Sequence, residues 1–407
     1  MNPAAERSHP SSSLRAAAGL ALAAAVSLGL ARFSYALLLP PMRSDLGWSY
    51  FTAGAMNTVN AAGYLLGALL LPRALARFDA RDVLLAGSGG AGVLLALHGF
   101  VTSDAALFGL RLLTGVTSAA AFVAGGLMAA RLAAAPHAAT AAGANGPRRP
   151  AAGLILGIYY GGTGAGIIAS ALLVPPIVLR SAAHAWQGAW IALGTVALLA
   201  TAVTRIATRD LAVGRTAAAA HQRFAWRPFG FGLAAYLFFG LGYIGYMTFV
   251  IGLLREQRLG DTAIVGFYAL LGAAVVASSW LWAGVLQRFR GGESLSLLNG
   301  LLAIATLLPV LSSHPLAVYA SGLLFGSVFL SLVASTTALV RHNLPPAAWP
   351  GGIGAFTIVF AAGQIVGPSL IGWVADGPGG LERGFVVSAL VLLAGSALAS
   401  RQKPLPR

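Results

Sequence analysis

The chain has 407 residues, of which 57% are apolar and only 9% are charged, and its formal net charge is +15. A water-soluble protein carries about a quarter charged residues, so a soluble globular protein is excluded. The chain has no cysteine, which excludes disulfides and thiolate metal sites. Lys403 is the only lysine and lies in the tail, so a phosphate-binding P-loop is excluded as well.

Long apolar stretches recur along the whole chain and predict a multi-pass helical membrane protein, because about 20 apolar residues cross a bilayer as a helix. The stretches lack the alternation of an outer-membrane barrel, so we expect an all-α fold. The first stretch is too long for a cleaved signal peptide and is predicted to be retained. The twelve predicted spans are residues 16–41, 50–72, 83–101, 105–131, 152–175, 183–204, 228–254, 262–286, 295–313, 316–340, 352–375 and 383–400.

Most of the 26 arginine and lysine residues fall in alternate connecting segments on the side of the N-terminus. By the positive-inside rule, both chain ends are predicted to face the cytoplasm in a multi-pass protein of the cell inner membrane. Because the basic residues are spread over several loops and form no single patch, we expect no nucleic-acid partner. The expected partner is the lipid bilayer, and the protein is predicted to be a monomer.

The two halves of the chain repeat each other at an offset of 211 residues. Gly29 corresponds to Gly240, Tyr35 to Tyr246, the pair Arg77-Phe78 to Arg288-Phe289, and the segment 112–115 to 323–326. The repeat predicts an N-terminal six-helix half (1–204), a basic cytoplasmic linker (205–227) and a C-terminal six-helix half (228–407). Two parallel six-span repeats are the architecture expected of an alternating-access carrier.

These residues also carry a family resemblance. The chain resembles the major facilitator superfamily over its full length, because Arg77-Phe78 and Arg288-Phe289 lie where that superfamily has its loop motif, and Arg111–Gly115 is similar to its fourth-span motif. The opening segment is similar to the YbfB/YjiJ-type branch. The resemblance implies a twelve-helix transporter with spans 1, 4, 7 and 10 around a central cavity. It also implies gating roles for Arg77, Asp79, Arg81 and Arg288, although Ala76 and Gln287 replace the acidic residue that usually precedes the arginine.

Arg32 and Arg111 are the only charged residues well inside predicted spans, whereas all eleven acidic residues lie in or beside connecting segments. A buried cation in a span costs at least ~2.5–3.5 kcal/mol, so such a residue indicates function. At ~1.5 Å per residue, both arginines lie roughly 10 Å inside the outer boundary. A bound carboxylate would supply the missing negative charge. The alternatives are that Arg111 bonds backbone carbonyls and that Arg32 pairs with Asp45 or Asp104.

Other polar side chains are weaker candidates for substrate contact. Tyr35 lies three residues after Arg32, and the repeat matches these two residues to Tyr246 and Tyr243. Each of these tyrosines could instead pack against neighbouring helices, and the remaining polar residues could hydrogen-bond between helices. The full predicted substrate-binding set is Arg32, Tyr35, Arg111, Tyr243, Tyr246, Asn57, Asn60, Tyr159 and Gln364.

The sequence therefore predicts a secondary active or facilitative transporter for a small organic anion, with the binding site between the halves. The first alternative is an exporter of apolar or cationic drugs, and the second is a membrane sensor that binds ligand without moving it. No metal cluster, GxSxG motif or paired intramembrane carboxylates are present, so we expect no enzyme, metal or cofactor. Coupling to a proton, exchange of anions and facilitated diffusion remain open.

Overall fold

The computed structural model describes residues 10–134, 152–178, 183–211 and 224–405. All regular elements within these ranges are helices, and twelve of them are long and apolar enough to cross a membrane. The predicted all-α membrane fold with twelve spans is therefore confirmed. Part of the predicted linker, residues 212–223, lies outside the described residues.

The spans follow one another with short connections. Span 1 is built from α1 (Pro10–Ala24), η1 (Ala25–Phe33) and α2 (Tyr35–Leu46), and span 8 from α9 (Asp261–Leu281) and α10 (Ala283–Arg288). Short 3₁₀ turns, η2 (Arg227–Phe229) and η3 (Pro346–Ala348), lead into spans 7 and 11. The other spans are α3 (Tyr50–Arg77), α4 (Ala80–His98), α5 (Asp104–Ala134), α6 (Ala152–Val178), α7 (Ala185–Ala207), α8 (Gly230–Glu256), α11 (Glu293–Leu311), α12 (Pro315–Asn343), α13 (Trp349–Ala375) and α14 (Gly380–Ala399).

Two helices continue past the prolines at their predicted ends. Span 1 was expected to end at residue 41 and span 2 at residue 72, and a proline stands at each of these ends. The helices instead continue through Pro40 and Pro41 to Leu46, and through Pro72 to Arg77. A membrane helix tolerates proline because neighbouring helices and local adjustments satisfy the carbonyl that loses its bond. Gly47, with a φ of 66°, ends span 1 in a left-handed cap.

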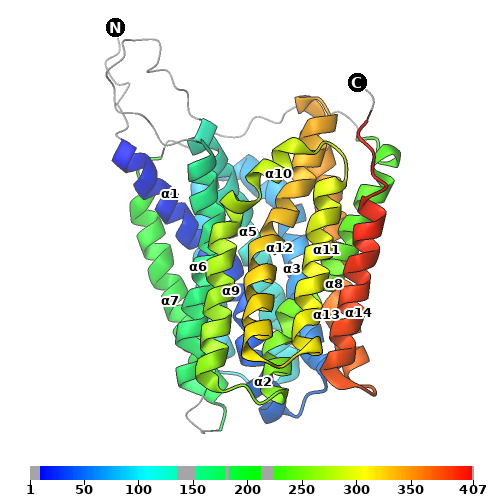
Figure 1. Ribbon diagram of the computed structural model, residues 1–407. Coiled ribbons are helices and arrows are strands. Elements are labelled where there is room, and N and C mark those ends of the chain that lie inside the picture. Colours follow the sequence, from blue (N-terminus) through cyan, green and yellow to red (C-terminus); the bar gives the residue numbers. More distant parts are fainter. Residues whose placement is uncertain (1–9, 135–151, 179–182, 212–223, 406–407) are drawn as a thin grey trace.

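The helices run side by side as a bundle, and both chain ends lie at the same end of it (Figure 1). We call this the termini end and the opposite one the far end. Spans 1 and 7 are the most buried, with 72% and 83% of their most apolar windows inside the protein. These two repeat-related helices therefore form the centre of the bundle.

The packing of the spans follows the internal repeat. A Cβ placed on Gly115 of α5 would lie 2.1 Å from the carbonyl oxygen of Asn60 on α3. A Cβ on Gly326 of α12 would lie 2.3 Å from the carbonyl oxygen of Leu271 on α9. Both pairs are separated by the same offset of 211 residues. Equivalent glycines thus let equivalent helices approach backbone to backbone in each half.

The C-terminal tail is packed against the second half. The side chain of Gln402 accepts a hydrogen bond from the backbone N–H of Gly232 (2.9 Å) and donates one to the carbonyl oxygen of Pro228 (3.0 Å). Its own carbonyl oxygen accepts from the N–H of Gly292 at 2.8 Å. The tail therefore joins the start of span 7 to the loop before span 9.

Candidate substrate site

Arg32 lies in an unusual stretch of span 1. Residues Ala25–Phe33 wind as a π-helix, and the N–H of Ser34 bonds the carbonyl oxygen of Gly29, five residues back, at 3.0 Å. A Cβ on Gly29 would lie 2.5 Å from the Cα of Gly166, so α6 packs directly against this stretch. Short π-helical segments occur frequently at functional sites, and nothing in the sequence pattern predicts this one.

The Arg32 guanidinium meets both halves of the protein. It donates a hydrogen bond to Oε1 of Gln364 on α13, and Nε2 of Gln364 donates to the Tyr243 hydroxyl on α8 at 2.8 Å. The guanidinium also lies 5.8 Å from the ring centre of Tyr64 on α3. Three residues of the predicted substrate-binding set, from spans 1, 7 and 11, are thus joined in one hydrogen-bonded group.

No acidic side chain among the described residues pairs with Arg32. The residue is only 4% exposed, and its Nε atom lacks a hydrogen-bond acceptor. Among the described residues, the ion pairs involve other cations, and Gln364 is neutral. Asp45 bonds His184 and Trp186, and Asp104 accepts from Trp48, so neither carboxylate neutralises Arg32. A buried charge without a counter-charge is unfavourable, and an anion beside it would be stabilised.

Arg111 is placed differently. It is fully buried, and its guanidinium donates to the carbonyl oxygen of Ala31 (2.9 Å) and to Oδ1 of Asn57 (3.3 Å). It also lies 4.9 Å from the ring centre of Tyr35. These contacts join span 4 to spans 1 and 2, which agrees with the alternative of a structural arginine. Direct substrate contact by Arg111 stays a prediction.

The two predicted asparagines hold helices together in this conformation. Asn57 donates from Nδ2 to the hydroxyl of Thr248 on α8 at 2.8 Å, so it bridges spans 2 and 7. Asn60 donates from Nδ2 to the carbonyl oxygen of Arg111 at 3.1 Å. Both side chains are buried.

The remaining predicted tyrosines are buried and have partners away from Arg32. The Tyr35 hydroxyl donates to the carbonyl oxygen of Ala53 at 2.8 Å, and Tyr35 faces Arg111 rather than the Arg32 group. The Tyr246 hydroxyl bonds the Ser321 hydroxyl at 2.7 Å, and Tyr159 donates to the carbonyl oxygen of Phe122. The regular spacing that put Tyr35 on one face with Arg32 does not hold across the change from π-helix to α-helix.

Apart from Tyr243, the aromatic side chains of this region were not singled out from the sequence. Tyr236, Phe239 and Tyr243 lie on one face of α8, and their rings stack with that of Phe360 on α13. We call these four residues the aromatic stack. The signal was present in the sequence as aromatic residues at i, i+3 and i+7 of span 7, which is helical spacing.

The far end of the bundle is closed by contacts between the halves. The carboxylate of Asp376 accepts from the N–H groups of Tyr50 (2.7 Å) and Phe51 (2.9 Å) at the start of α3. The Tyr50 hydroxyl donates to Glu256, and the Arg43 guanidinium lies 3.7 Å from the Tyr50 ring centre. A carboxylate at a helix start is favoured by the exposed N–H groups and the helix dipole. We call these five residues the far-end latch.

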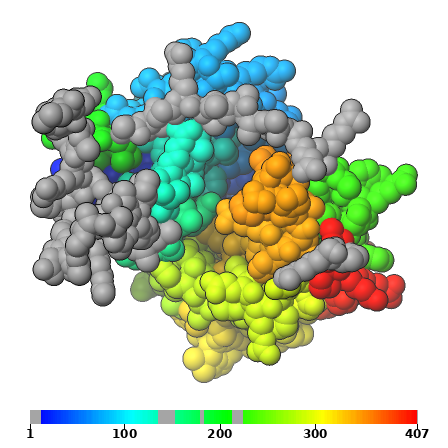
Figure 2. Space-filling model, turned by 90° about the horizontal axis from the view of Figure 1, so that it is seen from above, coloured from blue at the N-terminus to red at the C-terminus, as the bar shows by residue number. Residues whose placement is uncertain are grey.

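The termini end is open by comparison. Seen from that side, the surface is hollowed at its centre, between the end of α5 and the corner where α12 meets α13 (Figure 2). Tyr64 and Phe360 are half-buried, and Tyr160 on α6 is 40% exposed. A hollow at one end and a latch at the other are the arrangement of a carrier that is open to one side only.

Comparison with known proteins identifies the chain. A family profile described as uncharacterised MFS-type transporter YbfB matches residues 24–400. The chain belongs to this family. It is therefore a multi-pass membrane transporter of the major facilitator type, as the resemblance in its sequence predicted. No curated protein matches the transporter's sequence significantly.

Solved structures share the transporter's fold. A bacterial homologue of the human lysosomal transporter Spinster, in an inward-facing and unoccupied conformation, has a TM-score of 0.68 at 13% identity, over 95% of this chain and 96% of that one. A mutant of the nucleoside transporter NupG has a TM-score of 0.71 at 13% identity, over 95% of this chain and 99% of that one. At this level of identity, the likeness concerns the fold alone.

The predicted gating residues of the transporter lie at the termini end. Asp79 caps the start of α4 by accepting from the N–H of Arg81 at 2.8 Å. Arg81 donates to the carbonyl oxygen of Arg205 at 2.8 Å, so it joins spans 3 and 6 of one half. Arg77 and Arg288 are exposed at the ends of α3 and α10. Within the part of the chain that the structure describes, neither arginine makes a hydrogen bond or ion pair between the halves, and the gating role stays a prediction.

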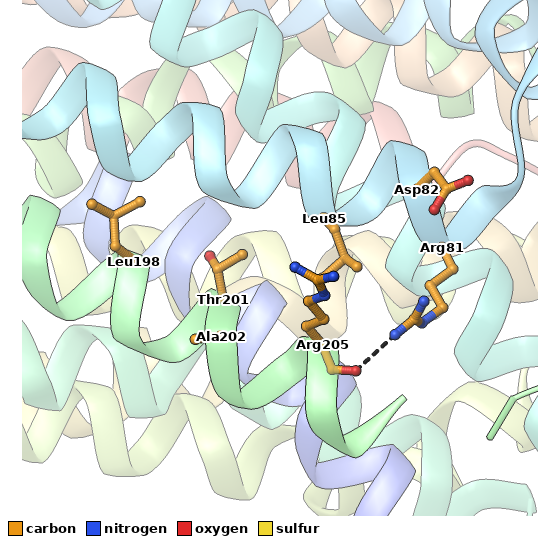
Figure 3. Close-up of a pocket in the computed structure, with 7 residues that line it drawn as sticks. All are labelled: Arg81, Asp82, Leu85, Leu198, Thr201, Ala202 and Arg205. Carbon is orange, nitrogen blue, oxygen red and sulfur yellow. Dashed lines mark hydrogen bonds between the residues drawn. The ribbon is translucent and has the colours of Figure 1, made fainter. Parts of the chain in front are cut away.

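A surface pocket of about 400 Å³ lies beside Arg81, between α4 and α7 (Figure 3). Both helices belong to the first six spans, so the pocket is not part of the path between the halves. Within the described residues, no three His, Asp or Glu side chains are grouped as a metal site requires. The pocket is lined by Arg81, Asp82, Leu85, Leu198, Thr201, Ala202 and Arg205.

Proposed function

We propose that this transporter carries small organic anions across the inner membrane by alternating access, with Arg32 as the main anion-binding residue. One observation carries the proposal: Arg32 is buried where spans 1, 7 and 11 meet, and no carboxylate among the described residues neutralises it. A carboxylate 4 Å from a guanidinium gains about 4 kcal/mol at an effective dielectric of 20. Substrate binding would therefore replace an unfavourable charge by a favourable pair.

The excess of basic residues at the termini end supports an orientation with both chain ends in the cytoplasm. The described conformation would then be open to the cytoplasm and closed to the outside by the far-end latch. Residues 1–204 and 228–407 would move as the two halves, joined by the linker 205–227. We propose a monomer as the working unit, and a proton as one of the possible coupling species.

The decisive experiment compares Arg32→Gln with Arg32→Lys in proteoliposomes. Glutamine removes the charge but keeps a polar group, whereas lysine keeps the charge without the planar fork. We expect Arg32→Gln to abolish anion uptake and Arg32→Lys to retain part of it. Both variants should elute as single monodisperse peaks in detergent, since removal of an uncompensated charge does not endanger folding. Uptake by Arg32→Gln at the rate of the unchanged protein would refute the proposal.

A drug exporter is the second candidate, because the aromatic stack and Tyr64 offer apolar surface beside Arg32. A thermal-shift screen separates the candidates, since a ligand that binds the folded state raises its melting temperature. Organic anions should raise it, and the rise should disappear in Arg32→Gln. Stabilisation by neutral or cationic drugs alone would favour the exporter, and binding without counterflow in proteoliposomes would favour the sensor.

A further inference from the structure

Resting on the proposed function, we infer that the substrate is an aromatic carboxylate, with its ring stacked on the half-buried face of Phe360 and its carboxylate bound by Arg32. Three features of the described residues support this assignment: the unneutralised guanidinium of Arg32, a flat aromatic surface near it, and a spacing between them that suits one small molecule.

The first feature concerns charge. Among the described residues neither buried arginine pairs with a carboxylate, and the Nε of each lacks an acceptor. Arg111 donates two hydrogen bonds, to Ala31 and Asn57, whereas Arg32 donates one, to the side-chain oxygen of Gln364. A carboxylate accepts two parallel hydrogen bonds from the planar guanidinium fork, which Gln364 cannot do with one oxygen. The Arg32 guanidinium therefore keeps more hydrogen-bonding capacity for a carboxylate than Arg111 does.

The second feature is the flatness of the aromatic stack. Phe360 stacks with Tyr236, Phe239 and Tyr243 at centroid distances of 4.9, 5.2 and 5.7 Å, and its ring plane lies within 20° of each of theirs. Tyr236, Phe239 and Tyr243 are at most 3% exposed, so Phe360 is the member that presents surface. Parallel rings offer a planar face to a further ring, and aromatic rings prefer offset stacking.

The third feature is the spacing along α13. Phe360 precedes Gln364 by one helical turn, which is ~6 Å along the axis, and both lie on the same face. Gln364 contacts Arg32 and Tyr243, and Tyr243 stacks on Phe360, so the charge and the ring surface are neighbours. A single ring with a short acidic side chain spans this distance. Tyr64, whose ring centre is 5.8 Å from the Arg32 guanidinium, adds a second aromatic neighbour.

The test measures binding to the purified full-length protein by calorimetry, with phenylacetate, cyclohexylacetate and 2-phenylethanol as probes. Phenylacetate and cyclohexylacetate share charge and size but differ in aromaticity, whereas 2-phenylethanol keeps the ring without the charge. We expect phenylacetate to bind about two- to tenfold more tightly than cyclohexylacetate, the contribution of an aromatic pair. The alcohol should bind much more weakly than either acid.

Two variants assign the effect to residues. Phe360→Leu should lower the affinity for phenylacetate to that for cyclohexylacetate, because leucine keeps apolar contact but removes the ring. Arg32→Gln should weaken both acids together. Phe100→Leu is the matched control, since Phe100 is 70% exposed on the outer surface of the bundle and should change neither affinity.

The outcomes distinguish this inference from the proposed function. Equal affinity for the two acids, or an equal loss of both in Phe360→Leu, would overturn the aromatic assignment and leave anion transport standing. Binding of 2-phenylethanol as tight as that of phenylacetate, unchanged in Arg32→Gln, would overturn both. A panel of benzoate, phenylacetate and indole-3-acetate in which no member binds would also contradict the inference.

Discussion

The two halves of the transporter share a scaffold but differ in the chemistry they place at equivalent positions. Arg32 corresponds to Tyr243 and Arg111 to Gly322 at the offset of 211 residues. Within the described ranges, the first half thus carries both buried cations, and the second half carries most of the stacked rings. Because the halves meet around Gln364, the difference places charge on one wall of the candidate site and aromatic surface on the other. Duplication fixes helix packing, whereas single positions decide what the site binds.

The shared scaffold can be tested by disturbing it equally in both halves. Gly115→Ala and Gly326→Ala each place a Cβ within 2.3 Å of a backbone carbonyl oxygen, so the helices must separate. We expect each to destabilise the protein by about 3 kcal/mol, the upper range for overpacking. Melting in detergent measures the effect, and Gly109→Ala, where a Cβ meets nothing within 4 Å, is the control. A large loss in only one half would contradict equivalent packing.

The next prediction separates the role of Arg111 in stability from the role of Arg32 in anion binding. Arg111→Met deprives Ala31 and Asn57 of a donor and should destabilise the protein by about 2 kcal/mol, as expected for two buried acceptors left unpaired. Arg32→Gln should change the melting temperature little but remove the stabilisation by anions. If Arg111→Met melted normally and lost anion binding, Arg111 would be a substrate-binding residue, as the sequence predicts.

The far-end latch joins the halves and should set how often the far end opens. Asp376→Asn removes the charge that holds the N–H groups of Tyr50 and Phe51. Losing about 1 kcal/mol here would raise the open population about fivefold. Because the chain has no native cysteine, a single cysteine introduced near Arg32 would report opening by labelling from the far side. Asp261→Asn, whose partner Arg255 is in the same half, should leave the labelling rate unchanged.

The smallest effect is expected away from the path between the halves. Arg205→Gln alters the lining of the pocket between α4 and α7. It keeps the hydrogen bond from Arg81, because the acceptor is the backbone carbonyl of residue 205. Uptake should therefore be unchanged, and the melting temperature should shift by no more than about 2 °C. A loss of uptake would mean that this pocket takes part in transport.

Hydropathy was sufficient to predict the fold, because a bilayer demands long apolar helices whatever their packing. The repeat was visible because close helix packing restricts the residue type at equivalent positions. Gly115 and Gly326 lie where helix backbones meet, and a larger residue does not fit there. Span ends were missed at Pro40 and Pro72, since the sequence does not show which neighbours satisfy a freed carbonyl.

The site was predictable only in part. Arg32, Tyr243 and Gln364 were each predicted as substrate-binding residues, because polar side chains are conspicuous in apolar spans. In the structure the three are joined by hydrogen bonds. Their pairing could not be predicted, because it depends on the π-helical winding of Ala25–Phe33 and on how α13 lies against α8. Phe360 was overlooked because one more aromatic residue in an apolar span is indistinguishable from lipid-facing or core packing.

The docking of Gln402 has a practical consequence for work on this transporter. Gln402 is hydrogen-bonded to the start of span 7, and the N–H of Leu405 donates to Asn343, so the tail up to Leu405 is packed against the second half. A purification tag or fluorescent reporter belongs after Leu405, with a spacer that leaves the hydrogen bonds of Gln402 intact. A chain shortened before Gln402 would lose the hydrogen bond to the N–H of Gly232. We expect this loss to loosen α8, which carries three of the four residues of the aromatic stack.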